Sequence, residues 1–163
     1  MWAAIILATG FSASAVVAYT RSHSGPGAYE SEIGPIVERY NGIIQRWNGF
    51  VDEFNSYAPS VNGEPDQTAA DGLRLTNRLA TDAQRAIADW NAVTPPPRLE
   101  ESHRLAAEAM RTTQSAFVEM SMYLEEITRN GVAFSDRAEA ASLKLAQASV
   151  LLERARASAR AAD

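Results

Sequence analysis

The sequence predicts an all-α protein in which a single N-terminal transmembrane helix precedes an up-down four-helix bundle. Three observations support this fold class. Residues 1–20 are mostly apolar and contain no charged side chain. Beyond them, apolar residues recur at alternating spacings of three and four, which is the period of one face of a helix. The sequence also lacks the regular alternation of apolar and polar residues that a half-buried strand requires.

The first predicted element is a membrane anchor, residues 1–20. As a helix, the stretch from Trp2 to Tyr19 would be roughly 26 Å long, close to the thickness of the hydrocarbon core of a bilayer. The two aromatic rings suit the two lipid–water interfaces. A cleaved signal peptide is an alternative, because Ala13-Ser14-Ala15 has the small residues of a cleavage site, although no Lys or Arg precedes the apolar run. A third alternative is an apolar helix docked on protein.

Small residues recur along the predicted anchor. Ala4, Ala8 and Ser12 are spaced four apart, and Gly10 and Ser14 form a second pair at the same spacing. Small residues at this spacing let another membrane helix approach closely, so we expect these five positions to pack against other transmembrane helices. The alternative is a composition bias, since anchors rich in Ala and Ser are common.

Two features of the sequence give opposite indications of the side of the membrane on which the bundle lies. Arg21 follows the apolar run, and the positive-inside rule would keep the bundle in the cytoplasm. The signal-like start of the chain instead favours export. We expect a single-pass protein of a bacterial inner membrane with its bundle on the periplasmic side.

The first bundle helix is expected to follow a linker, residues 21–33, and to run from about residue 34 to 56. The linker is rich in helix breakers, with Ser22-His-Ser-Gly-Pro-Gly27 at its centre. Pro35 fits the first turn of a helix, where its missing N–H costs nothing. The expected core residues of this helix are Ile33, Val37, Tyr40, Ile44, Trp47, Val51 and Phe54.

The second and third helices are expected at about residues 67–92 and 98–129. Thr94-Pro-Pro-Pro97 separates them, because residues before proline avoid helical angles. The expected core residues of the second helix are Leu73, Thr76, Ala80, Ala83, Ile87 and Trp90. Those of the third are Leu99, His103, Ala106, Met110, Thr113, Phe117, Met120, Leu124 and Ile127.

The last helix is expected to begin near Ser135, whose hydroxyl suits an N-cap, and to complete a bundle that spans residues 34–163. Its expected core residues are Ala138, Ala141, Leu145, Ala148, Leu152 and Ala155. Four amphipathic helices joined by short loops favour the up-down arrangement.

Composition excludes several classes of function. The chain has no cysteine, which rules out disulfides, thiol catalysis, cysteine-ligated metals and a lipoprotein cysteine. The formal net charge is −5, with acidic and basic residues interleaved, so no nucleic-acid footprint is visible. No phosphate-binding glycine loop or hydrolytic triad is present.

His103 is the one candidate cofactor ligand. Glu100 and His103 have the Glu-x-x-His spacing of di-iron bundles, but such a site needs two of these motifs, and the only other histidine, His23, lies in the linker. A haem would need a second axial ligand that does not come from the same helix. A single histidine on an apolar face is more often a hydrogen-bonded core residue. We therefore expect no catalytic residue, no metal and no cofactor.

The segment Thr94-Pro-Pro-Pro-Arg-Leu99, with His103 and an alanine-rich helix after it, resembles a segment of small bacterial cell-envelope helical-bundle proteins. The resemblance covers the central third of the chain. It implies an exported or membrane-anchored bundle without assigned activity, in which His103 matches a recurring histidine. This sequence departs from many such proteins because it lacks the lipoprotein cysteine, which leaves residues 1–20 as its anchor.

These features favour a non-enzymatic, membrane-anchored accessory or scaffold subunit of a larger bacterial membrane complex. Its expected partners are the lipid bilayer and integral membrane subunits, and a photosynthetic reaction-centre–antenna complex or a respiratory complex is the specific expectation. The alternative is a periplasmic ligand-binding or sensor module with a single anchor. A third reading is an enzyme or electron carrier centred on His103.

Overall fold

The computed structural model describes residues 27–56, 65–130 and 135–162, and within these ranges the chain forms helices and no strand. The elements are α2 (Ala28–Ser56), α3 (Pro65–Ala92), the short 3-10 helix η1 (Pro97–Leu99), α4 (Glu100–Asn130) and α5 (Ser135–Ala161). The expectation of an all-helical protein with a four-helix bundle is thereby confirmed. None of the helices described is both long and apolar enough to cross a membrane. The predicted anchor, residues 1–20, lies outside the described residues.

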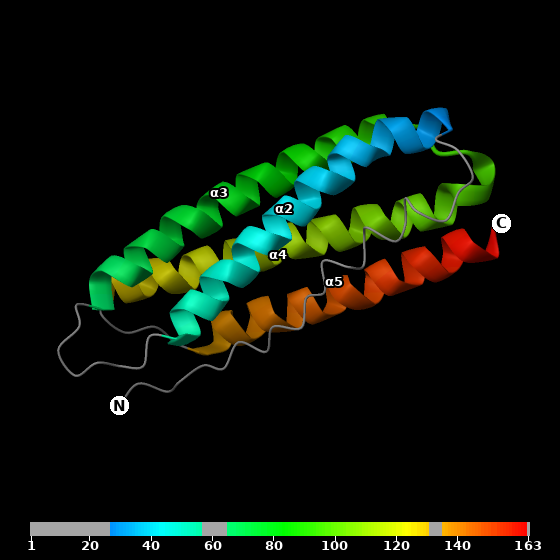
Figure 1. Ribbon diagram of the computed structural model, residues 1–163. Helices are drawn as coiled ribbons and strands as arrows, with labels where there is room; N and C mark the ends of the chain where they lie inside the picture. Colours follow the sequence, from blue (N-terminus) through cyan, green and yellow to red (C-terminus); the bar gives the residue numbers. More distant parts are fainter. Residues whose placement is uncertain (1–26, 57–64, 131–134, 163) are drawn as a thin grey trace.

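Successive long helices run in opposite directions (Figure 1). The start of α2, the end of α3, the start of α4 and the end of α5 therefore lie together at one end of the bundle. α4 packs along both α3 and α5, and α2 packs along α3. This arrangement makes α4 the central helix of the bundle, and its apolar face meets three neighbours.

α2 begins at Ala28, six residues earlier than the sequence analysis predicts. Tyr29 and Ile33 are both buried, so the apolar face extends one turn further toward the N-terminus than expected. Pro35 consequently lies inside the helix and not in its first turn. Its missing N–H removes one intrahelical hydrogen bond, and the exposed position of Pro35 leaves the freed carbonyl of Ser31 accessible to water.

The buried face of α3 differs in part from the predicted one, because at three positions the residue before the predicted one faces the core. Thr76, Ala83 and Trp90 are buried as expected. Leu73, Ala80 and Ile87 are only partly buried, and the positions one residue earlier, Gly72, Leu79 and Ala86, take their place in the core. Two adjacent faces of α3 carry apolar residues, so the contacts with α2 and α4 decide which one turns inward.

Gly72 is needed at the contact between α2 and α3. A Cβ atom at this position would lie 2.5 Å from the ring carbon Cζ of Phe50 and 3.2 Å from a methyl carbon of Leu124. The absent side chain gives the Phe50 ring its place between α3 and α4.

The predicted core face of α4 is confirmed at every position, because all nine residues from Leu99 to Ile127 named above are buried. The buried surface is wider than one face, as expected for a helix with three neighbours. It also includes Ser102, Leu105, Ala107, Ala109, Ala116 and Ser121. The six expected core residues of α5 are buried as well.

Candidate functional site

His103 lies in the first turns of α4, at the end of the bundle where α2 begins and α3 ends. Its side chain is buried, and only 8% of the residue's surface is exposed. Its ring nitrogen Nδ1 lies 2.9 Å from the hydroxyl oxygen of Tyr29 in α2. The direction of this hydrogen bond follows the tautomer: with the proton on Nε2, the Tyr29 hydroxyl donates to Nδ1.

Trp90, near the end of α3, covers one face of the His103 ring. The two rings are stacked, with centroids 4.6 Å apart and planes inclined by 16°. The indole N–H of Trp90 donates to the backbone carbonyl of His103 at 3.0 Å. A neighbouring hydroxyl extends the cluster to α5, since Ser102 Oγ donates to the carbonyl of Ala155 at 2.8 Å. Side chains of residues 102 and 103 thus connect α4 to the other three long helices.

The environment of His103 favours the neutral imidazole. Burial lowers the pKa of His103 below its ordinary value of 6.5, and this effect exceeds the opposing effect of a hydrogen bond with the Trp90 backbone. This geometry fits a histidine that joins helices, which is the core role weighed in the sequence analysis.

The Glu-x-x-His spacing does not form a metal site. Glu100 and Glu101 are exposed, and Glu101 pairs with Arg104 at 2.8 Å. No group of three or more His, Asp or Glu side chains in the described ranges is placed to hold a metal ion. His23 lies outside those ranges.

A second buried hydrogen bond joins α2 to α4 further along the bundle. The hydroxyls of Tyr40 and Thr113 are 2.7 Å apart, and both residues are fully buried. Burial raises the pKa of Tyr40 far above its ordinary value, so the phenol stays protonated at any physiological pH. The hydroxyl groups of Tyr29 and Tyr40 in α2 are thus both hydrogen-bonded to polar side chains of α4.

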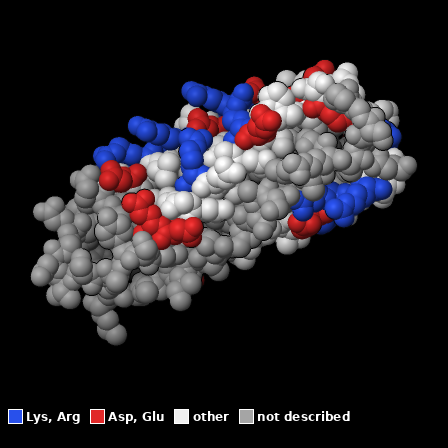
Figure 2. Space-filling view, in the orientation of Figure 1, with Lys and Arg blue, Asp and Glu red and all other residues white. Residues whose placement is uncertain are grey.

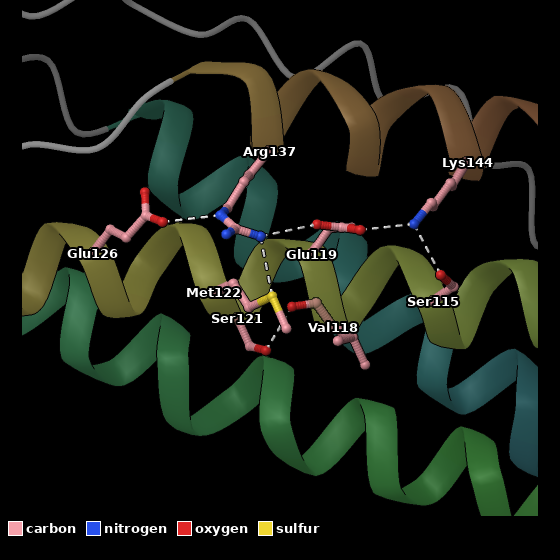
Figure 3. Close-up of polar contacts among 8 residues, drawn as sticks. All are labelled: Ser115, Val118, Glu119, Ser121, Met122, Glu126, Arg137 and Lys144. Carbon is pink, nitrogen blue, oxygen red and sulfur yellow. Dashed lines mark hydrogen bonds and ion pairs between the residues drawn. The ribbon is translucent and has the colours of Figure 1, made fainter.

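A network of charged groups bridges α4 and α5 at the edge of the bundle (Figure 3). Glu119 of α4 lies between two cations of α5: Lys144 Nζ is 2.9 Å away and Arg137 Nη1 is 3.4 Å away. Arg137 also donates to Glu126 at 2.9 Å, and Lys144 donates to Ser115 Oγ at 2.9 Å. The two cations lower the pKa of Glu119, with the Lys144 hydrogen bond as the largest cause.

On the face shown in Figure 2, acidic and basic side chains alternate over the described surface. Many of them are paired, as in the contacts of Arg46 with Asp82 at 2.9 Å and of Arg39 with Asp89. No broad region of one sign covers the described part of this face.

The predicted membrane residues lie outside the described part of the chain. They are the helix-packing positions Ala4, Ala8, Gly10, Ser12 and Ser14 and the interfacial residues Trp2 and Tyr19. The expectations for them stay predictions.

Two exposed apolar residues on the solvent-facing side of α5 were not predicted from the sequence. Leu143 is 72% exposed and Val150 is 60% exposed. The signal was present in the sequence, because both residues are apolar and lie away from the predicted inward face of that helix.

Comparisons of the chain with known protein families, with curated proteins and with solved structures found no match.

Proposed function

We propose that this protein is a non-enzymatic, membrane-anchored accessory or scaffold subunit of a larger bacterial membrane complex. The observation that carries the proposal is the uncharged apolar segment 1–20 directly ahead of a helical bundle. A helix of that length and composition suits a single membrane crossing. Its small residues suit contact with other membrane helices, which is the chemistry of a subunit embedded in an assembly.

The start of α2 supports a short tether between membrane and bundle. Only residues 21–27 separate the predicted anchor from Ala28. Seven residues span at most about 25 Å even when fully extended. The end of the bundle that holds His103 would therefore stay within about 25 Å of the membrane surface, on the periplasmic side of the inner membrane in the orientation that we propose.

The contacts of His103 support a structural role at this tethered end. Its ring bonds Tyr29 and stacks on Trp90, so its contacts serve the junction of α2, α3 and α4. Contacts that join three helices at this end suit a subunit whose bundle is held in place by its anchor. The complex that we propose as host is a photosynthetic reaction-centre–antenna assembly or a respiratory assembly.

The test is purification of the tagged full-length protein from its native membrane in a mild detergent, with mass spectrometry and an absorption spectrum of the same fraction. A stoichiometric set of larger membrane subunits is the expected result, with any pigment or haem belonging to them. A protein that elutes alone would contradict the proposal and favour a periplasmic ligand-binding or sensor module. A haem or metal bound to the isolated chain would instead support the reading centred on His103.

Matched variants test the anchor. Gly10→Leu and Ser12→Leu add bulk to the small-residue positions and should reduce co-purification of the partner subunits. Ile6→Leu keeps the volume of the side chain and should leave co-purification unchanged. If all three variants retain the partners equally, the small residues do not form the contact.

A further inference from the structure

The methionines of α4 differ in their access to solvent. Met110 and Met120 are buried, at 1% and 2% exposed, whereas Met122 is 42% exposed. Met1 lies outside the described residues. The chain has no cysteine, so the thioether of methionine is the only side-chain sulfur that it contains. Because oxidants react first with accessible sulfur, Met122 is the methionine of the described ranges that is most open to them.

The sulfur of Met122 lies beside a cation of the neighbouring helix (Figure 3). Arg137 Nη1 of α5 donates to Met122 Sδ at 3.1 Å. Thioether sulfur is a weak acceptor, so this contact alone does not fix the guanidinium group. Two carboxylates of α4 do so, since Arg137 also pairs with Glu126 at 2.9 Å and with Glu119 at 3.4 Å. The donor is thus held at the sulfur by its contacts with other residues.

The contact with Arg137 gives the two sides of the Met122 sulfur different surroundings. An oxidant can approach a thioether from either side of the plane through Cγ, Sδ and Cε, and the two approaches give sulfoxides of opposite configuration. The guanidinium group occupies the space on its own side of the sulfur and engages the electrons there. Approach from the open side is therefore favoured, and it yields one configuration.

We propose that Met122 is a site of oxidation by hydrogen peroxide and that Arg137 directs the reaction to one sulfoxide epimer. A lone pair of the sulfur attacks one oxygen of the peroxide, so that an S–O bond forms and the O–O bond breaks. The sulfur loses two electrons. The hydroxide that leaves takes the proton of the transferred oxygen and departs as water.

Oxidation changes the chemistry of the edge between α4 and α5. The product carries a polar, chiral group in place of an apolar one, and the sulfoxide oxygen is a stronger acceptor than thioether sulfur. This group lies at the bridge that Arg137 forms between the two helices. The proposal concerns this edge alone and does not depend on the predicted membrane anchor or on the host complex.

Treatment of the full-length protein with hydrogen peroxide, followed by peptide mapping, tests the site. Fragmentation spectra distinguish Met120 from Met122. We expect Met122 to be oxidised faster than Met110 and Met120 by a factor on the order of ten or more. Met122→Leu keeps an apolar side chain at this position and should abolish the fast reaction within α4. Equal rates at the three methionines would overturn the proposal.

The configuration of the sulfoxide is measured with the two classes of methionine sulfoxide reductase, each of which reduces one epimer. The oxidised protein is digested first, so that the fold does not limit access of the reductases. Separate samples of the peptide that carries residue 122 are then treated with each class. One class should reduce most of the sulfoxide and the other little. Equal reduction by both classes would overturn the proposal.

Matched arginine variants test the role of the contact. Arg137→Ala removes the donor at the sulfur and should give both epimers in similar amounts. The side chain of Arg137 is 41% exposed, so the fold should tolerate this change. Arg129→Ala removes an exposed arginine that pairs with Glu125 of its own helix and should keep the single epimer. A single epimer in Arg137→Ala, or a mixture in Arg129→Ala, would contradict the proposed role of Arg137.

Discussion

α2 and α5 both pack in a bundle whose central helix is α4, but they use opposite kinds of side chain. α2 contributes large residues, among them Tyr40, Ile43 and Trp47, which are at most 1% exposed. α5 contributes mainly alanines, and Ala138, Ala141 and Ala148 are fully buried. Large side chains fill the centre of the bundle, whereas small ones let α5 lie close along α4. The contact of α2 is therefore specified by the shapes of large side chains, and the contact of α5 with α4 by the close approach that small side chains allow.

Polar groups also differ between the two sides, apart from the buried hydrogen bond that Ser102 of α4 donates to the carbonyl of Ala155 in α5. On the α2 side, buried tyrosine hydroxyls of Tyr29 and Tyr40 bond to His103 and Thr113. On the α5 side, the charges that bridge to Glu119 lie at the edge of the contact, where they are partly exposed. Buried hydrogen bonds cost more to break than screened ion pairs, so changes on the α2 side should have the larger effects.

The largest expected effect comes from Trp47→Ala. Trp47 is 1% exposed, and its ring centroid lies 5.4 Å from that of Phe117. Its indole N–H has no acceptor among the described residues, so the loss is one of packing. We expect the free energy of unfolding to fall by about 3–5 kcal/mol, measured by urea titration. Asp52→Ala, on the exposed side of α2, should change it by less than about 0.5 kcal/mol.

Ala148→Leu tests the close approach of α5. A larger side chain at this fully buried position must push α5 away from the core, which should lower the free energy of unfolding by about 1–3 kcal/mol. The neighbouring Gln147→Leu points to solvent and serves as the control. A well-tolerated Ala148→Leu would show that the α5 contact is not specified by small residues.

Acidification should weaken the junction at His103. The pKa of His103 is below 6.5 in the folded chain because of burial, so the folded state binds fewer protons than the unfolded state in this range. The contribution of this residue is complete above about pH 6.5 and decreases as the pH falls below that value. Thermal unfolding measured between pH 7.5 and 5 should show a steeper loss than in His103→Gln, which does not titrate. Parallel curves for the two proteins would rule out this coupling.

The smallest expected effect is that of Glu119→Gln, which removes the carboxylate between Lys144 and Arg137. The side chain of Glu119 is 26% exposed, so solvent screens the pair, and we expect a loss of at most about 1 kcal/mol. Glu125→Gln, which interrupts the ion pair with Arg129 on α4 alone, should have a smaller effect still. Equal effects would mean that the bridge between helices adds nothing beyond a local pair.

How far the sequence predicts this fold depends on the helix. The face of α4 was predicted at every position, because one unbroken apolar pattern left only one way to turn the helix. On α3, apolar residues occupy two adjacent faces, and the contact of Gly72 with Phe50 helps to decide which face is buried. The start of α2 was predicted too late, because Pro35 suggested a first turn, whereas burial of Tyr29 and Ile33 extends the helix past it.

The contacts of the candidate site can be predicted from the sequence even less well than the buried faces of the helices. The sequence identified His103 as a residue of the apolar face, yet its main partner Tyr29 is 74 positions away in the chain. No local spacing relates the two residues, and only the packing of α2 on α4 brings them together. The exposed apolar residues Leu143 and Val150 of α5 were missed for a different reason, since both lie away from the inward face predicted for that helix and the sequence already carried the signal.

The sequence by itself determined that the described chain is helical, that a break separates α3 from α4 and which face of α4 is buried, because these depend on periodicity and on local backbone preferences. It also supplied the apolar segment 1–20 on which the proposed membrane role rests. The tertiary structure decided which face of α3 turns inward, which partners neutral His103 meets and which apolar residues of α5 remain at the surface. These features depend on the packing of helices that are distant in sequence, and a local pattern does not record that packing.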